Sequence, residues 1–312
     1  MKNVFRAGLC VIITGVMLAG CGKNSNTDIR ETGVFESDVS LEADNNEISD
    51  FYGIPRVTET KEIKRAEKQD LIDEVKRINL NKDLTEEDIE ELWLYTWVVF
   101  HIQDSVDISL ISRLENLEKL AIHQGDTPNL FETSSRAYIS DFSFLNNMQI
   151  KKLEINFSDK DIILNGINLP QLEELEINCA KIIDDEIITS FPNLKNLYIG
   201  HSDVESIAPF CGMDLERMSF YNTNFKEENS DSINDIITLV DLAFAFTNIS
   251  FSTLSGLTKL EYLYLQRIPD DFDFEMLFEL TWLRALNLEI SPPEGFIERY
   301  KEANPTVYTY WF

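Results

Sequence analysis

One short apolar pattern recurs through most of the chain and constrains the fold more than any other feature. The pattern is L-x-x-L-x-L, with Leu, Ile, Met or Phe at the apolar positions. Seven of the eight intervals between successive copies are 21 to 24 residues long. Such a period predicts a stack of similar coils. The copies begin at Leu117, Ile150, Leu172, Leu194, Leu215, Leu239, Leu260 and Leu283, with a degenerate copy at Tyr95.

The repeat unit has a direct physical interpretation. Alternating apolar residues form a short strand with one buried face, and about 15 residues then return the chain to the next strand. One coil cannot bury its own apolar face, so the coils stack and their strands form a parallel sheet. The return segments are short and contain Ser, Asp and Pro, which favours 3₁₀ turns over long helices. The predicted fold class is an α/β solenoid of about nine coils, with the sheet on its concave face and irregular or 3₁₀ segments on its convex face.

The repeats resemble the leucine-rich repeat superfamily, in the short form typical of internalin-like bacterial surface proteins. The resemblance covers residues 95–291 and includes segments such as 247–250. One column departs from the family pattern, which places Asn eight residues after the first Leu. Five of the nine residues there are Ser or Thr, whose hydroxyls also bond backbone groups. We expect less regular stacking at Gly125, Ala180 and Ile268.

The first residues carry Lys2 and Arg6, followed by an apolar run over 7–18 and then L-A-G-C, ending at Cys21. The run is shorter than the roughly 20 apolar residues of a membrane span. The stretch resembles a bacterial lipoprotein signal, which implies cleavage before Cys21 and a lipid on its sulfur. The resemblance predicts an extracytoplasmic protein, lipid-anchored to the bacterial cell membrane. An ordinary secretion signal or a membrane anchor is the alternative.

Five segments are therefore expected. They are a lipoprotein signal peptide (1–20), the lipidated cysteine with a flexible acidic tether (21–50), a helical N-terminal cap (51–94), the leucine-rich repeat solenoid (95–290) and a C-terminal cap (291–312). The tether has too few large apolar residues to offset its ordering entropy.

The two caps have their own signals. Helix formers are concentrated over residues 58–78, and Thr85 with the acids after it predicts the start of a helix that ends near Trp93. At the other end we expect a short helix over 295–303 and a strand over 306–312. A solenoid needs such caps because its bare ends would expose the core.

The charge excludes two classes of partner. Lys and Arg number 27 against 55 Asp and Glu, for a net charge of −28. This argues against binding duplex nucleic acid, and against electrostatic docking on an anionic membrane surface.

The sequence contains no arrangement typical of an enzyme. It has three His, no G-x-S-x-G, no P-loop, no G-x-G-x-x-G and no H-E-x-x-H. We therefore predict a protein without catalytic residues or cofactor. Acidic turns at 184–186 and 270–273 have carboxylates that suit calcium, although solvated turns are the more common case. The repeat phase places Cys179 and Cys211 on opposite sides of the coils, which disfavours a disulfide.

The same phase predicts the ligand-binding surface. The third, fifth and seventh residues of each copy point away from the core, and the eighth lies where the strand ends. An acidic strip of Glu154, Glu174 and Glu176 falls on this concave face, as do the His residues. Tyr and Arg, which supply much of the energy of protein interfaces, gather further along. The predicted ligand-binding residues are Tyr198, His201, Arg217, Tyr221, Phe246, Tyr262, Tyr264 and Arg267.

One interval is 33 residues long, and its additional residues lie within 124–138. They follow a strand, so Leu130 and Phe131 are predicted contacts in a loop at the rim. A neutral insertion is the alternative, because long surface loops cost little closure entropy.

These features together predict a lipid-anchored extracytoplasmic protein that binds a macromolecule on its concave face. The expected partner is an extracellular or envelope protein. The alternatives are a glycan-binding or cell-wall-binding module, since aromatic faces also stack on sugar rings, and a structural envelope component without a soluble ligand.

Overall fold

The computed structural model describes the repeat array and both its ends. The described residues are 71–102, 105–124, 139, 141–162, 164, 166–182, 190–226 and 230–311. All belong to one compact unit, residues 63–312. The predicted signal peptide, Cys21, the tether and the rim loop with Leu130 and Phe131 lie outside the described residues.

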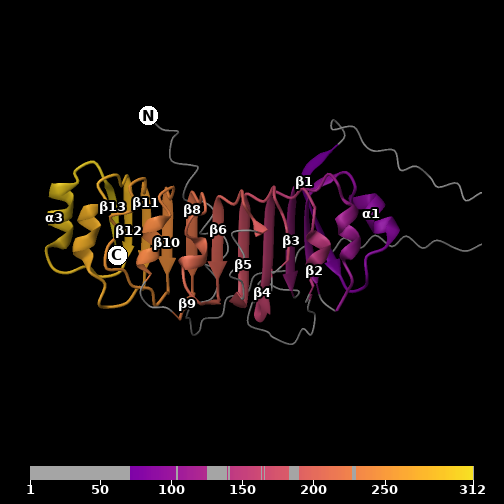
Figure 1. Ribbon diagram of the computed structural model, residues 1–312, viewed down its shortest axis with the longest axis horizontal. Coiled ribbons are helices and arrows are strands. Elements are labelled where there is room, and N and C mark those ends of the chain that lie inside the picture. The colour runs from indigo at the N-terminus through magenta and orange to yellow at the C-terminus, as the bar shows by residue number, and fades with distance from the viewer. Residues whose placement is uncertain are drawn as a thin grey trace, which may run out of the picture. The chain divides into compact units, whose positions relative to one another are not determined.

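The described residues form a 13-stranded sheet in which all strand pairs are parallel (Figure 1). The main path runs β1-β2-β3-β4-β5-β6-β8-β10-β11-β12-β13, while β7 and β9 form a short side ladder that continues from β5. Each of the nine predicted repeats supplies one strand, which confirms the predicted solenoid. The strands are β1 (Ile72–Leu80), β2 (Tyr95–Ile102), β3 (Lys119–Gln124), β4 (Lys152–Ile162), β5 (Glu174–Ile182), β6 (Asn196–Gly200), β7 (Asp203–Val204), β8 (Arg217–Tyr221), β9 (Asn224–Phe225), β10 (Asp241–Ala245), β11 (Tyr262–Gln266), β12 (Ala285–Glu289) and β13 (Tyr308–Trp311).

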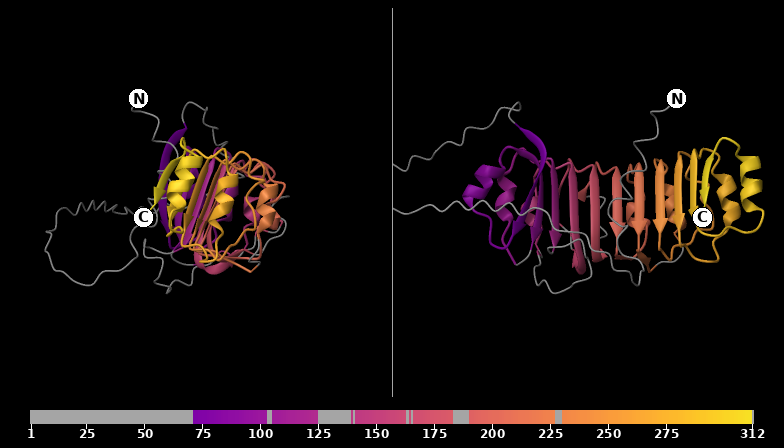
Figure 2. Two further views of the ribbon diagram at one scale, coloured as in Figure 1. Left: turned by 90° about the vertical axis from the view of Figure 1, so that its left-hand side faces the viewer. Right: turned by 180° about the vertical axis from the view of Figure 1, so that it is seen from behind.

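Short helical turns return the chain between strands. In the end-on view of Figure 2 the strands lie along one side of the array and most helical turns along the other. Single 3₁₀ turns occur where the short Ser-, Asp- and Pro-containing segments predicted them, and in two further coils. The helical segments are α1 (Glu86–Leu92), η2 (Ser109–Arg113), η3 (Ser143–Leu145), η4 (Ala208–Phe210), η5 (Asp231–Asp235), η6 (Phe274–Glu279) and α3 (Phe296–Ala303).

The core lies between the sheet and these turns. The fourth and sixth residues of every copy point into it, as Leu175 and Ile177 do with no exposed surface. Equivalent residues stack from coil to coil, and the rings of Phe220 and Phe244 lie 5.5 Å apart and nearly parallel. Burial of such side chains stabilises the array by roughly 1.5–3 kcal/mol for each large residue.

The N-terminal cap corrects one prediction. Residues 72–78, expected to be helical, belong to strand β1, which pairs in parallel with β2. The backbone N–H and C=O groups at the edge of β2 need partners, and pairing with β1 satisfies them. This tertiary demand outweighs local helix propensity, which amounts to only tenths of a kcal/mol per residue.

The predicted helix at Thr85 and the predicted C-terminal helix and strand are confirmed, whereas residues 58–70 of the expected N-terminal helix lie outside the described residues. Helix α1 begins with Thr85, whose hydroxyl accepts from the Asp88 N–H at 3.3 Å while the Asp88 carboxylate accepts from the Thr85 N–H at 2.8 Å. This reciprocal pair satisfies two backbone donors at the helix start. At the other end, α3 and β13 occupy the predicted helix and strand.

Two hydroxyls in the column that departs from the family pattern bond the backbone as expected, whereas the buried Thr247 hydroxyl has no hydrogen-bond partner among the described residues. Ser202 Oγ donates to Gly200 O at 2.7 Å, and Thr223 Oγ1 donates to Ile199 O at 3.2 Å. The amide of Asn248 exchanges two 2.7 Å hydrogen bonds with the backbone of Phe225, which ties neighbouring coils together.

Candidate ligand-binding face

The sheet face opposite the core is called the open face below. It carries the third, fifth and seventh residue of each repeat copy, and parallel pairing places equivalent residues in rows across the array. One such row runs through Glu154, Glu176, Tyr198 and Ser219 on β4, β5, β6 and β8. Two regions of this face are distinguished by their side chains.

The first region begins at the carboxyl ends of β6, β8, β10 and β11. The residue after each strand is His201, Asn222, Phe246 or Arg267, with φ of 51°, 48°, 57° and 45°. This left-handed backbone conformation costs non-glycine residues roughly 1–3 kcal/mol each. Backbone hydrogen bonds hold it in place, as the N–H of His201 donates to Tyr221 O at 2.9 Å and that of Phe246 to Gln266 O at 2.8 Å.

The side chains at these positions contact one another in series. The rings of His201 and Tyr221 pack edge to face at 5.3 Å, and those of Tyr221 and Phe246 at 5.4 Å. The Arg267 guanidinium lies 5.0 Å from the centre of the Phe246 ring, in cation–π geometry. We call His201, Tyr221, Asn222, Phe246 and Arg267 the rim stack. It offers a partner a series of mutually inclined aromatic rings beside one permanent positive charge.

A hydrogen bond to Asn222 indicates the tautomer of the His201 imidazole. The Asn222 amide nitrogen lies 3.0 Å from His201 Nδ1 and can only donate, so Nδ1 accepts and the ring proton is on Nε2. Burial also lowers the pKa of His201. The imidazole is therefore neutral at pH 7, and Arg267 carries the charge of the rim stack.

Of the four remaining predicted site residues, Tyr264 lies next to this stack. Tyr264 donates to the Gln266 side chain at 2.9 Å, and burial, with Glu289 second, raises its pKa. Tyr221 and Tyr264 flank β10, whose Ala243 and Ala245 are only 3% and 4% exposed although they belong to the open face.

The other three predicted residues lie apart from the rim stack. Tyr262 and Arg217 occupy the row at the start of the strands and are both exposed. Arg217 is in register with Asp241, whose pKa burial raises while the charge of Arg217 opposes the rise. Tyr198 faces the second region, and burial followed by the charge of Glu176 raises its pKa.

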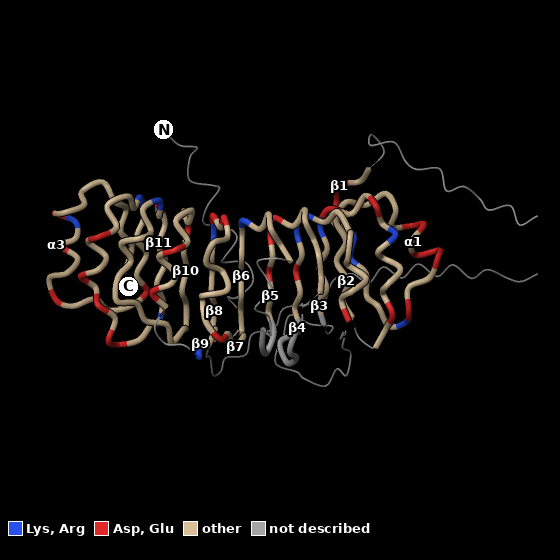
Figure 3. The backbone as a smooth tube through the Cα atoms, in the orientation of Figure 1, with Lys and Arg blue, Asp and Glu red and all other residues tan. Residues whose placement is uncertain are grey.

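The second region is a charged cluster on β3, β4 and β5, formed by His123, Lys152, Glu154, Glu174 and Glu176. Figure 3 shows the acidic positions on β4 and β5. His123 Nε2 donates to Glu154 at 2.7 Å, and Lys152 Nζ donates to Glu174 at 2.5 Å. Glu176 makes no hydrogen bond or ion pair with any residue that the structure describes.

Burial controls the charges of this cluster. It would raise the pKa of Glu154, but His123 and Lys152 outweigh it and lower that pKa. Burial lowers the pKa of Lys152, but Glu174 reverses the effect and raises it. At Glu176 the more distant charges of Lys152 and His123 oppose the rise but do not outweigh it, so burial, with the Glu154 carboxylate second, raises its pKa to about 7.

Asn178 borders this cluster and was not among the predicted site residues. It is two residues from Glu176 on the same face of β5, it is 8% exposed, and its amide has no hydrogen-bond partner among the described residues. A Cβ at Gly200 would lie 2.1 Å from Asn178 Oδ1, so the amide occupies the space that this glycine leaves open. Its outward repeat position was visible in the sequence, but its burial and missing partner were not.

The last strand adds a further aromatic surface that prediction did not assign to the site. Tyr308, Tyr310 and Trp311 of β13 are 61%, 40% and 37% exposed. The ammonium of Lys301 lies 4.0 Å from the centre of the Trp311 ring.

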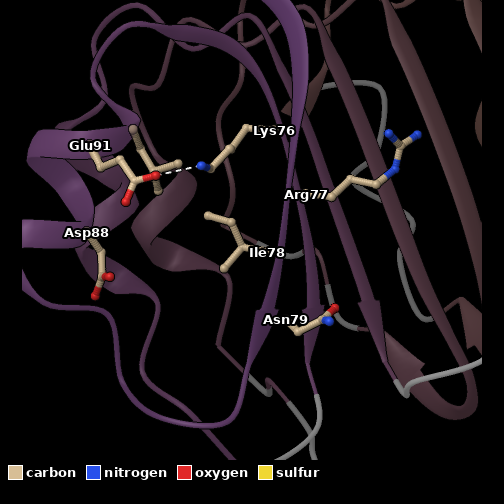
Figure 4. A pocket seen from close by; sticks show the side chains of 7 residues that line it. Lys76, Arg77, Ile78, Asn79, Asp88 and Glu91 are labelled. Carbon is tan, nitrogen blue, oxygen red and sulfur yellow. Dashed lines mark hydrogen bonds and ion pairs between the residues drawn. The ribbon is translucent and has the colours of Figure 1, made fainter. Parts of the chain in front are cut away.

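A polar cleft of about 300 Å³ lies at the opposite end of the array, between β1 and α1 (Figure 4). Its lining includes Arg77, Asn79 and Asp88, and an ion pair of 2.5 Å joins Lys76 to Glu91. None of the predicted site residues lines it.

The described residues contain no group of three His, Cys, Asp or Glu side chains placed to hold a metal ion. The turn at 270–273 uses Asp273 to accept from the Glu275 N–H at the start of η6, and the turn at 184–186 lies outside the described residues. Cys211 is a free thiol, and its Sγ lies 3.0 Å from Ser232 O. No helix in the described ranges is long and apolar enough to cross a membrane.

Neither a known protein family nor a curated protein sequence matches the chain. Solved structures do resemble it. Internalin C2 of Listeria monocytogenes is 18% identical with a TM-score of 0.38, over 55% of this chain and 71% of that one. An internalin (inlF) of the same organism is 16% identical with a TM-score of 0.36, over 76% and 82%. The leucine-rich repeat ectodomain of the receptor kinase GASSHO1/SCHENGEN3 from Arabidopsis thaliana is 16% identical with a TM-score of 0.38, over 69% and 29%. These similarities concern the repeat architecture.

Proposed function

We propose that this chain is an extracytoplasmic binding protein that recognises a protein ligand on its open face, with the rim stack at the centre of the contact. A solenoid presents an extended surface that suits a large partner. On this surface, the side chains of the rim stack are those we propose to contact the ligand.

The observation that carries the proposal is the rim stack itself. Three successive ring–ring or ring–guanidinium contacts run across β6, β8, β10 and β11. In four consecutive strand-bearing coils, the residue that follows the strand has a left-handed backbone conformation. Strain of this kind persists only where the surroundings enforce it, and it is concentrated at functional sites. Aromatic rings beside an Arg are also the commonest anchors of protein interfaces.

The binding test would immobilise the full-length protein and screen it against parallel panels of extracellular proteins and soluble glycans. The double variant Y221A/F246A removes the centre of the rim stack. Trp282→Ala is the matched control, because Trp282 is 64% exposed in the turn before β12 and lies outside the rim stack.

The proposal expects a saturable protein ligand whose affinity falls at least tenfold in Y221A/F246A and is unchanged in Trp282→Ala. A protein ligand that binds both variants equally would overturn the site. Glycan binding alone, or no ligand for a well-folded protein, would favour the cell-wall or structural alternative.

We further propose that the mature protein is anchored to the bacterial membrane through a lipid on Cys21. Support comes from the charged start, the short apolar run and the L-A-G-C sequence. Growing cells with a labelled fatty acid should label the wild-type protein and the control Cys10→Ser, whereas Cys21→Ser should carry no label. Label retained in Cys21→Ser would refute the anchor.

A further inference from the structure

The charged cluster on β3, β4 and β5 contains more negative than positive partners. Three carboxylates, Glu154, Glu174 and Glu176, lie in this cluster with Lys152 and His123, while Lys119 on the same face lies over the Trp97 ring. Lys152 is committed to Glu174 and His123 to Glu154. Glu176, at the centre of the row between Glu154 and Tyr198, is left without a cation.

An unpaired carboxylate that is partly removed from water is unfavourable unless something compensates it. The nearby Lys152 ammonium already donates to Glu174, and the two residues beside Glu176 in its row are unsuitable for that role. Glu154 has the same charge and lies directly across on β4, while Tyr198 on the other side is a neutral phenol. A partner that brings positively charged N–H donors would supply what the cluster lacks.

Asn178 gives independent support. Its amide is more than nine-tenths buried, has no hydrogen-bond partner among the described residues, and lies beside Glu176 on the same face of β5. Side chains two residues apart on one strand are separated by about 7 Å, a distance that a guanidinium with several donors can bridge. The Asn178 amide oxygen occupies the space that Gly200 leaves without a side chain.

We propose that Glu176 and Asn178, assisted by Glu154, form a subsite for a cationic side chain, Arg or Lys, of the protein ligand. The proposal rests on the protein-binding function above and specifies the charge that the ligand presents at this point. The Glu176 carboxylate accepts N–H donors from the cation, and Asn178 Oδ1 accepts another. A neutral sugar hydroxyl satisfies the hydrogen bonds but leaves the carboxylate charge uncompensated, so glycans are disfavoured here. The net charge of −28 also attracts a basic partner over longer distances.

The test uses small probes, so that it does not depend on finding the protein ligand. N-acetyl-arginine amide and N-acetyl-lysine amide would be titrated into the full-length protein at pH 8, with ¹³C-labelled Glu side chains observed by NMR. N-acetyl-citrulline amide is the neutral control, since it has nearly the same shape as the arginine probe. Glu173→Gln is the matched protein control, because Glu173 is exposed three residues from Glu176 and the charge change is the same.

The cationic probes should bind the wild type and Glu173→Gln alike, should shift the Glu176 signal, and should bind Glu176→Gln at least tenfold more weakly. Citrulline should bind at least tenfold more weakly than arginine. Equal binding of arginine and citrulline, or undiminished binding to Glu176→Gln, would overturn the subsite.

The outcome is separable from that of the proposed function. A protein ligand that binds through the rim stack but is insensitive to Glu176→Gln overturns the subsite alone. Intact arginine binding with no protein ligand in the panels overturns the proposed function and leaves the cation site standing.

Discussion

Replacing Glu176 by Gln should stabilise the fold at neutral and alkaline pH, even though it removes the proposed cation subsite. Burial and the neighbouring Glu154 carboxylate raise the pKa of Glu176 from 4.5 to about 7. The folded protein therefore binds the Glu176 proton more tightly than the unfolded chain does. The contribution of the wild-type carboxyl to the free energy of unfolding is therefore fully present below pH 4.5 and is lost as the pH rises through 7. Gln resembles the protonated acid and has no charge to bury.

The size of the effect follows from the pKa difference. A shift from 4.5 to about 7, at about 1.4 kcal/mol per pH unit, corresponds to roughly 3 kcal/mol. The groups that face Glu176 are Glu154, Lys152, Glu174, Tyr198 and His123. The advantage of Glu176→Gln should be near zero at pH 4, grow between about 4.5 and 7, and level off above.

Urea unfolding at pH 4, 5.5, 7 and 8.5 would measure this difference for Glu176→Gln and for the exposed control Glu173→Gln. For a unit of this size roughly 3 kcal/mol corresponds to a rise in Tm of about 6–12 °C, which thermal melts would show at pH 8.5. A variant that is less stable than the wild type at pH 8.5, or a difference that does not change with pH, would refute the assignment of a buried, unpaired carboxylate. A gain in stability combined with a loss of cation binding would show that the wild type keeps an unfavourable charge for binding.

Three further substitutions test the packing beneath the open face and the proposed cation subsite. Phe220→Ala removes a ring stacked on Phe244 in the core and should lower the free energy of unfolding by about 3–5 kcal/mol in urea titrations; a loss under 1 kcal/mol would contradict the stacked core. Asn248→Ala leaves the Phe225 backbone N–H and C=O without their partner and should cost about 2–3 kcal/mol by the same assay, whereas no change would mean that water replaces the amide. Gly200→Ala places a methyl group against the Asn178 amide and should weaken binding of N-acetyl-arginine amide several-fold; unchanged affinity would show that Asn178 is not part of the subsite.

The repeat phase predicted which residues share one face of the sheet, because a solenoid converts spacing along the chain into position on a surface. His201, Tyr221, Phe246 and Arg267 were chosen from their places in the repeat, and the structure brings all four together in one stack. Equivalent residues 21 to 24 positions apart must become neighbours once the coils stack. What the phase did not show is that the backbone at these positions is left-handed, because φ depends on how the chain turns out of each strand.

The N-terminal cap shows where local sequence signals fail. Thr85 and Asp88 predicted the start of α1 correctly, since a capping box is satisfied within four residues. The helix formers before Thr85 predicted a helix where β1 forms. That prediction was wrong because the deciding interaction is backbone pairing with β2, about 22 residues away along the chain. The same distinction applies to Glu176 and Asn178, whose outward direction is periodic but whose lack of a partner depends on the side chains of β4 and β6.

The amino-acid sequence by itself determined the coil number, the strand positions and the direction in which each strand residue points, because these follow from the period and from the alternation of apolar residues. Only the tertiary structure decided that β1 caps the sheet, that Arg267 lies over Phe246, and that Glu176 is the one carboxylate of its cluster that forms no ion pair with a described residue. Those outcomes depend on which side chains of neighbouring coils reach one another and on how much water they exclude. Neither the contacts between neighbouring side chains nor the exclusion of water follows the repeat period, so the repeat pattern alone does not predict them.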